Sequence, residues 1–152
     1  MEAFWTIKRG LIMKRLLAVL AMAGVLAGCT SAPLLNPTPS AIPEAKTADI
    51  RSAIVTAATS RHWNIVKANS DHFLLSYPSG AKAQSFEVVV RVDYNKEGYK
   101  VSYVSSRGLD EKSADKTKDE KIHIHRNVNR WMANLNKDIQ AYYQRNAYRK
   151  AK

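Results

Sequence analysis

The sequence predicts an α+β fold, a two-layer αββββα sandwich in which an antiparallel four-stranded sheet carries two helices on one face. Two observations lead to this prediction. Apolar residues recur at helical spacing near residue 50 and again near residue 130, whereas between these segments they occupy every second position. A sandwich of two layers lets both helical stripes and the apolar face of the sheet share one core.

The first helix is expected to begin at Thr47, because a hydroxyl suits a helix N-cap and Asp49 then lies in the first turn, where the helix dipole favours negative charge. Its apolar stripe consists of Ile50, Ala53, Ile54, Ala57 and Ala58. Strands should follow over residues 63–67 and 73–77, with Asn69-Ser70-Asp71 as the turn between them. A helix that leads into a hairpin is therefore expected.

The clearest strand covers residues 86–94. Its apolar face consists of Phe86, Val88, Val90, Val92 and Tyr94. Asn95 to Gly98 should close a hairpin into a fourth strand that ends near Ser105. Residues 106–121 are mostly charged or polar, so we expect a loop there.

A long amphipathic helix is expected to begin between Ile124 and Asn127. Its apolar stripe consists of Val128, Trp131, Met132, Leu135, Ile139 and Tyr142. The domain is accordingly assigned to residues 47–146 and a basic tail to residues 147–152. Aromatic and basic side chains near this end would suit a lipid head-group layer, and a frayed terminus is the alternative.

Residues 1–28 have the features of a secretory signal. Lys14 and Arg15 precede an apolar run over residues 16–28 that ends in small residues. A helix of about 13 residues spans about 20 Å, short of a hydrocarbon core about 30 Å thick, so a permanent transmembrane helix is disfavoured. Met13 stands where a signal would start, which leaves translation from Met1 or from Met13 open.

The segment Leu26-Ala27-Gly28-Cys29 resembles the lipobox of bacterial prolipoproteins. The resemblance implies that the sulfur of Cys29 receives a diacylglycerol, that cleavage falls between Gly28 and Cys29, and that the new amino group is acylated. A thiol is nucleophilic enough for this reaction, and the chain has no second cysteine with which to form a disulfide. Thr30 at the next position implies transport to the outer membrane. The expected location is the cell envelope, with a lipid-anchored domain facing the periplasm.

Residues 29–46 are expected to form a tether between the lipid and the domain. They hold four of the five prolines in the chain, namely Pro33, Pro37, Pro39 and Pro43. An extended, polyproline-like spacer of about 17 residues, at about 3.1 Å per residue, would let the domain stand up to roughly 50 Å from the bilayer.

A second motif lies at the start of the last predicted helix, where residues 124–131 read Ile-His-Arg-Asn-Val-Asn-Arg-Trp and are followed by Asn134-Leu135 and Asp138-Ile139. Together with Ala53-Ile54 and the stretch to Trp63, this motif resembles a group of small uncharacterised proteobacterial lipoproteins. Val128 stands where that group has a Tyr, and the charged loop is longer. The resemblance covers most of residues 47–142 and implies location and fold, but no activity.

The chain is strongly basic, with a formal net charge of +11. Four basic residues and one acidic residue belong to residues 1–28, which leaves +8 for the remainder. Such a charge favours anionic partners, such as lipid head groups or acidic polymers of the envelope. Export makes nucleic acid an unsuitable partner. A positive surface that only maintains solubility is the alternative.

Two pairs of side chains are candidates for a site. His123 and His125 can share one face of an extended segment, as metal ligands do, although the third ligand is not indicated and surface or helix-cap histidines are the alternative. Arg126 and Arg130 lie four residues apart on one helix face, where they would hold a phosphate or carboxylate together or simply be solvated. No metal or other cofactor is assigned.

The sequence therefore predicts a non-enzymatic, lipid-anchored envelope lipoprotein that binds an envelope protein or an anionic envelope polymer, or that assists assembly. The alternative is a small metal-dependent or hydrolytic periplasmic enzyme that uses His123 and His125. The sequence contains no glycine-rich phosphate loop, nucleophile elbow or His-Glu-x-x-His segment.

Overall fold

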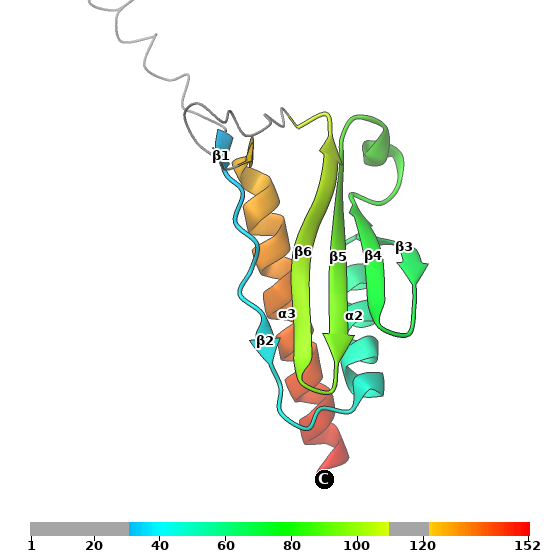
Figure 1. Ribbon diagram of the computed structural model, residues 1–152. Coiled ribbons are helices and arrows are strands. Elements are labelled where there is room, and N and C mark those ends of the chain that lie inside the picture. Colours follow the sequence, from blue (N-terminus) through cyan, green and yellow to red (C-terminus); the bar gives the residue numbers. More distant parts are fainter. Residues whose placement is uncertain (1–30, 110–121) are drawn as a thin grey trace, which may run out of the picture. The chain divides into compact units, whose positions relative to one another are not determined.

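Alternating apolar residues build an antiparallel sheet of five strands in the order β2-β6-β5-β4-β3 (Figure 1). The strands are β2 (Ser40–Ala41), β3 (Asn64–Ala68), β4 (His72–Tyr77), β5 (Glu87–Asn95) and β6 (Gly98–Arg107). A second, two-stranded sheet pairs β1 (Ser31–Pro33) with β7 (His123–His125). The structure is a computed structural model that describes residues 31–109 and 122–152. The predicted signal, Met13, Gly28, Cys29 and most of the charged loop lie outside the described residues.

Two long helices cover one face of the main sheet (Figure 1). They are α2 (Thr47–Ser60) and α3 (Arg126–Lys150), and a short 3₁₀ helix, η2, covers Ala81–Gln84. The buried face of α3 consists of Val128, Met132, Leu135 and Ile139, and that of β5 consists of Val88, Val90, Val92 and Tyr94. These residues belong to one hydrophobic core together with the buried stripe of α2. The predicted stripes are therefore confirmed, except that Phe86, Trp131 and Tyr142 are only partly buried against this core.

The coarse fold prediction is confirmed, because the chain forms an α+β domain with an antiparallel sheet and two long helices. The prediction of a four-stranded sheet is wrong. The main sheet has a fifth strand, β2, and the β1–β7 pair lies outside it. One strand of each addition, β2 or β1, comes from the proline-rich segment. Pro33 lies in β1, because a proline can occupy an edge strand although it donates no hydrogen bond.

Residues 31–42, the N-terminal strap, are bound to the domain and do not form a free tether. Asn129 of α3 forms two hydrogen bonds with the strap. Its amide nitrogen donates to the Pro33 carbonyl at 2.8 Å, and its amide oxygen accepts from the Leu35 N–H at 3.0 Å. The Tyr103 N–H donates to Asn36 Oδ1 at 2.8 Å. The prediction that residues 29–46 are a tether and that the domain begins at residue 47 is therefore wrong for the described part, which joins one compact unit from Ser31 to Lys152.

The helix ends also differ from prediction. Lys46, not Thr47, occupies the N-cap position of α2, and no side chain caps that end by a hydrogen bond. Helix α3 begins at Arg126, inside the predicted range, but it continues to Lys150, so most of the predicted tail over residues 147–152 is helical. An ion pair between Lys150 and Asp49 joins the end of α3 to the start of α2.

Tyr99 ties β6 to α3. Its hydroxyl donates to the backbone oxygen of Asn136 at 2.8 Å, and burial raises the pKa of Tyr99 above the ordinary value near 10. Because the folded-state pKa is the higher one, the contribution of Tyr99 to stability is complete below about pH 10 and is lost as the pH rises through the folded-state pKa. We expect Tyr99→Phe to lower the free energy of unfolding by about 1 kcal/mol at neutral pH, and by less in alkali. Urea unfolding of both proteins across this range measures the difference, and a pH-independent difference would contradict the assignment.

Candidate functional site

The candidate site is a surface hollow of about 370 Å³ between the carboxyl end of α2 and the first half of α3. We call it the Arg130 hollow. Its lining residues are Ser60, Arg61, His62, Trp63, Tyr77, Arg130, Trp131 and Asn134. Segments that are far apart in the sequence therefore meet here, and the set combines aromatic rings with cationic and amide side chains.

Aromatic rings form the apolar part of the hollow. The ring centroids of Trp63 and Tyr77 lie 5.2 Å apart, and those of Tyr77 and Trp131 lie 4.7 Å apart. Phe86 stacks on Trp131 from another side, with centroids 5.5 Å apart and an angle of 15° between the planes. Tyr77 and Trp131 are only partly buried, so parts of both rings stay accessible beside the core. Such contacts hold each ring in one orientation.

The turn that ends α2 positions the rim of the hollow. His62 has a φ of 59°, in the left-handed region that usually favours glycine after a helix. This turn lets the Trp63 N–H donate to the Ala58 carbonyl at 2.9 Å, while the His62 carbonyl accepts from the Ser79 N–H at 2.8 Å. The helix end is thus fastened to the loop after β4, and the chain reverses so that Trp63 enters the core.

Two arginines line the hollow, and they differ in whether a carboxylate pairs with the guanidinium. Arg61 forms an ion pair with Asp138 of α3, and the hydrogen bond to that carboxylate raises the pKa of Arg61. Asp138 therefore compensates the charge of Arg61. Arg130 is exposed, and among the described residues nothing forms a hydrogen bond or ion pair with its guanidinium. Arg130 consequently contributes an uncompensated positive charge beside the aromatic rings.

Both predicted arginines lie on α3, four residues apart as expected. Arg130 lines the hollow, but Arg126, one turn earlier on α3, does not. That the two arginines hold one anion together stays a prediction. Sequence reasoning did not find the contributions of Arg61, His62, Trp63 and Tyr77. The one hint in the sequence was that cationic and aromatic residues, Arg61-His62-Trp63, follow directly after a helix. That this segment lies next to α3 is decided only by the folded structure.

The predicted histidine pair lies on β7, opposite β1. His125 is the N-cap residue of α3, where its Nδ1 accepts from the Asn127 N–H at 3.3 Å, so one ring nitrogen has a structural partner. His123 lies two residues away on the same short strand. In residues 31–109 and 122–152 there is no group of three or more His, Cys, Asp or Glu side chains that could hold a metal ion.

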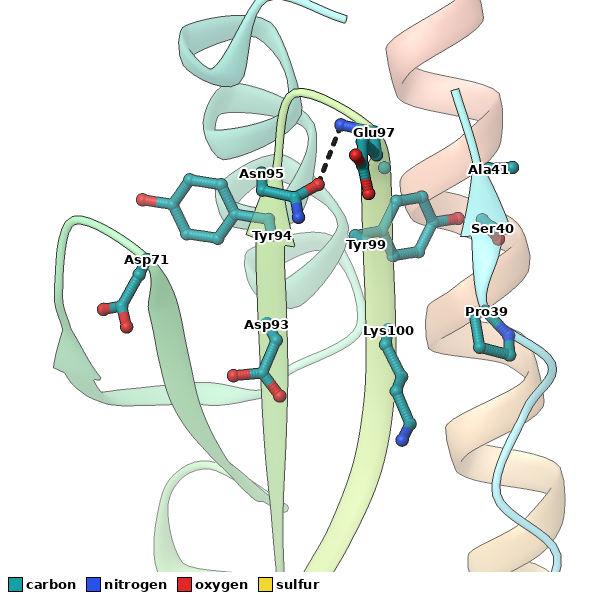
Figure 2. A pocket seen from close by; sticks show the side chains of 11 residues that line it. Pro39, Ser40, Ala41, Asp71, Asp93, Tyr94, Asn95, Glu97, Tyr99 and Lys100 are labelled. Carbon is teal, nitrogen blue, oxygen red and sulfur yellow. Dashed lines mark hydrogen bonds between the residues drawn. The ribbon is translucent and has the colours of Figure 1, made fainter. Parts of the chain in front are cut away.

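A second hollow, of about 510 Å³, lies at the β5–β6 turn and is richer in carboxylates (Figure 2). Asp93 pairs in register with Lys100 on the neighbouring strand, and Figure 2 shows Asp71 on the other side of Asp93. Arg91 Nε donates to Asp93 at 2.6 Å. The hydrogen bond from His72 lowers the pKa of Asp71. These two carboxylates already have partners, so this hollow is the weaker candidate.

Comparisons with protein-family models, with curated proteins and with solved structures give no match for this chain. Among the described residues, no helix has both the length and the apolar character needed to cross a membrane.

Proposed function

We propose that this protein is a lipid-anchored envelope lipoprotein that binds an anionic polymer at the Arg130 hollow and catalyses no reaction. The lipobox-like segment ending in Cys29, behind a basic and apolar leader, supports the anchor. Thr30 after the cysteine supports an outer-membrane location, and the proposal places the domain on the periplasmic side of that membrane. Labelling of cells with palmitate tests the anchor.

The observation that carries the binding proposal is the uncompensated guanidinium of Arg130 beside exposed parts of aromatic rings. A guanidinium recognises a carboxylate or phosphate through paired hydrogen bonds. An adjacent indole and phenol offer apolar faces and polar edges. Together they suit a ligand that presents an anionic group next to a ring. An anionic sugar polymer of the periplasm has this chemistry.

The same geometry favours binding over acid–base catalysis. Asp138 is held by Arg61 and is not available as a base. Among the lining residues, no carboxylate accompanies the imidazole of His62 as an acid–base pair, and Asn134 and Ser60 add only neutral hydrogen-bonding groups to the rim. A hollow that combines aromatic rings with a few converging polar groups is suited to hold a small ligand group in one orientation.

A matched pair of variants tests the site. Arg130→Gln should weaken binding of soluble peptidoglycan fragments about tenfold, because a hydrogen bond to a charged group contributes about 1.5 kcal/mol. Arg126→Gln removes the same charge one turn away and should change the affinity less than about twofold. Trp63 and Trp131, the only tryptophans after residue 28, both line the hollow, so intrinsic fluorescence reports binding.

An uncharged oligosaccharide serves as the ligand control and should bind both variants equally. Equal weakening by Arg130→Gln and Arg126→Gln would show that only the total charge matters, which would contradict a site at the hollow. Fragments that do not bind the wild-type protein would contradict this choice of polymer.

A further inference from the structure

Because the N-terminal strap is bound to the domain, it cannot act as a spacer between the domain and Cys29. Its first residue, Ser31, lies opposite His125 in the β1–β7 ladder, and Asn129 holds the next residues by two hydrogen bonds. The strap then follows β6, where Ser40 pairs with Tyr99. The chain from Ser31 onward is therefore part of the folded domain.

Only two peptide units separate Ser31 from Cys29. Two residues of fully extended chain span at most about 7 Å, in place of the roughly 50 Å of a free proline-rich tether. If the sulfur of Cys29 carries the lipid, Ser31 must stay within this reach of the head-group layer. The position of β1 in the fold then decides which part of the domain is close to the membrane.

The β1–β7 ladder lies at one end of the domain, beside the start of α3 and the end of β6, and the carboxyl terminus lies at the opposite end (Figure 1). Helix α3 has 25 residues and so extends for about 37 Å between these ends. Exposed Arg107 and Arg126 lie near the β1 end. Basic side chains close to an anionic leaflet are attracted to it.

We infer that the β1–β7 end of the domain rests on anionic phospholipid head groups, while the carboxyl end of α3 points into the periplasm. This inference rests on the proposed lipid anchor at Cys29. A body attached at one end by a very short link has that end nearest to the bilayer, averaged over its possible tilts. The aromatic and basic side chains near the end of α3 are then presented to the periplasm.

The test compares two labelled forms of the lipidated full-length protein. Arg126→Cys places a thiol at the β1–β7 end, and Ala147→Cys places one near the other end of α3, both at exposed positions. Cys29 is the only native cysteine and is blocked by the lipid, so a fluorophore reacts only at the new thiol. Each form is reconstituted into vesicles of phosphatidylethanolamine and phosphatidylglycerol that contain a head-group nitroxide lipid as a contact-range quencher.

We expect quenching at position 126 to be several-fold stronger than at position 147. Equal quenching at both positions would overturn the inference, because a free tether lets the domain rotate and averages the two ends. Stronger quenching at position 147 would overturn it as well. Flotation of the vesicles separates this result from failure of the anchor: protein that does not float contradicts the proposed lipidation, whereas protein that floats with equal quenching contradicts only the orientation.

Discussion

Replacing Cys29 by serine is expected to abolish palmitate incorporation completely. A hydroxyl is far less nucleophilic than a thiolate, so the diacylglycerol cannot be attached and cleavage before residue 29 should fail. Two or three acyl chains give a stable anchor, since each buried methylene contributes about 0.8 kcal/mol and a single chain holds only marginally. Palmitate labelling and the intact mass measure the change, and the variant should retain its leader, from Met1 or Met13 to Gly28.

A second variant controls for the uncleaved leader, whose apolar run would itself adhere to a membrane. When residues 1–29 are replaced by a leader that is cleaved without lipidation, the domain should be released as a soluble periplasmic protein. Palmitate on the serine variant, or membrane binding of the domain from the second leader, would contradict the anchor.

Gly98→Ala should cause the largest loss of stability among single substitutions at turn glycines. Gly98 has a φ of 142°, and a Cβ built there would lie 2.0 Å from the Ser40 carbonyl oxygen in the strap. The strap would have to move away, with loss of the β2–β6 pairing and of the 2.8 Å bond from the Ile42 N–H to the Glu97 carbonyl. We expect the free energy of unfolding to fall by about 4 kcal/mol, as measured by urea denaturation.

Gly80→Ala is the matched control. Gly80 also has a positive φ, of 78°, but a Cβ there would meet no atom within 4 Å. The substitution should lower the free energy of unfolding through backbone strain alone, by about 2 kcal/mol. If both substitutions cost the same, the packing of the strap against Gly98 would not contribute to stability.

Local patterns in the sequence predict most of the regular structure. The apolar stripe that includes Leu135 and Ile139 makes one side of α3 apolar, independently of the elements that pack against it. Val88, Val90 and Val92 alternate with other residues along β5, so their side chains lie on one face of the strand, which is the buried one. Such patterns depend on near neighbours along the chain. This is why the helices and the central hairpin could be predicted with nearly correct ends.

The strap could not be predicted in this way. Its prolines, including Pro33 in β1, are typical of an extended spacer, and an extended segment looks the same in sequence whether it is solvated or paired with an edge. The contacts that bind it come from Asn129 and Tyr103, which lie far away in the sequence. A hydrogen-bonding amide on a distant helix leaves no periodic signal.

The sequence alone determines the net positive charge and the kinds of secondary structure, and it predicts a leader and a lipid anchor at Cys29, because each of these depends on composition or on neighbouring residues. Only the tertiary structure brings Trp63 and Tyr77 next to Arg130 and leaves that guanidinium without a partner among the described residues. The tertiary structure also binds the expected tether to the domain as the N-terminal strap. Strand pairing at an edge and a side-chain amide from a distant helix supply hydrogen-bond partners for the backbone groups of the strap.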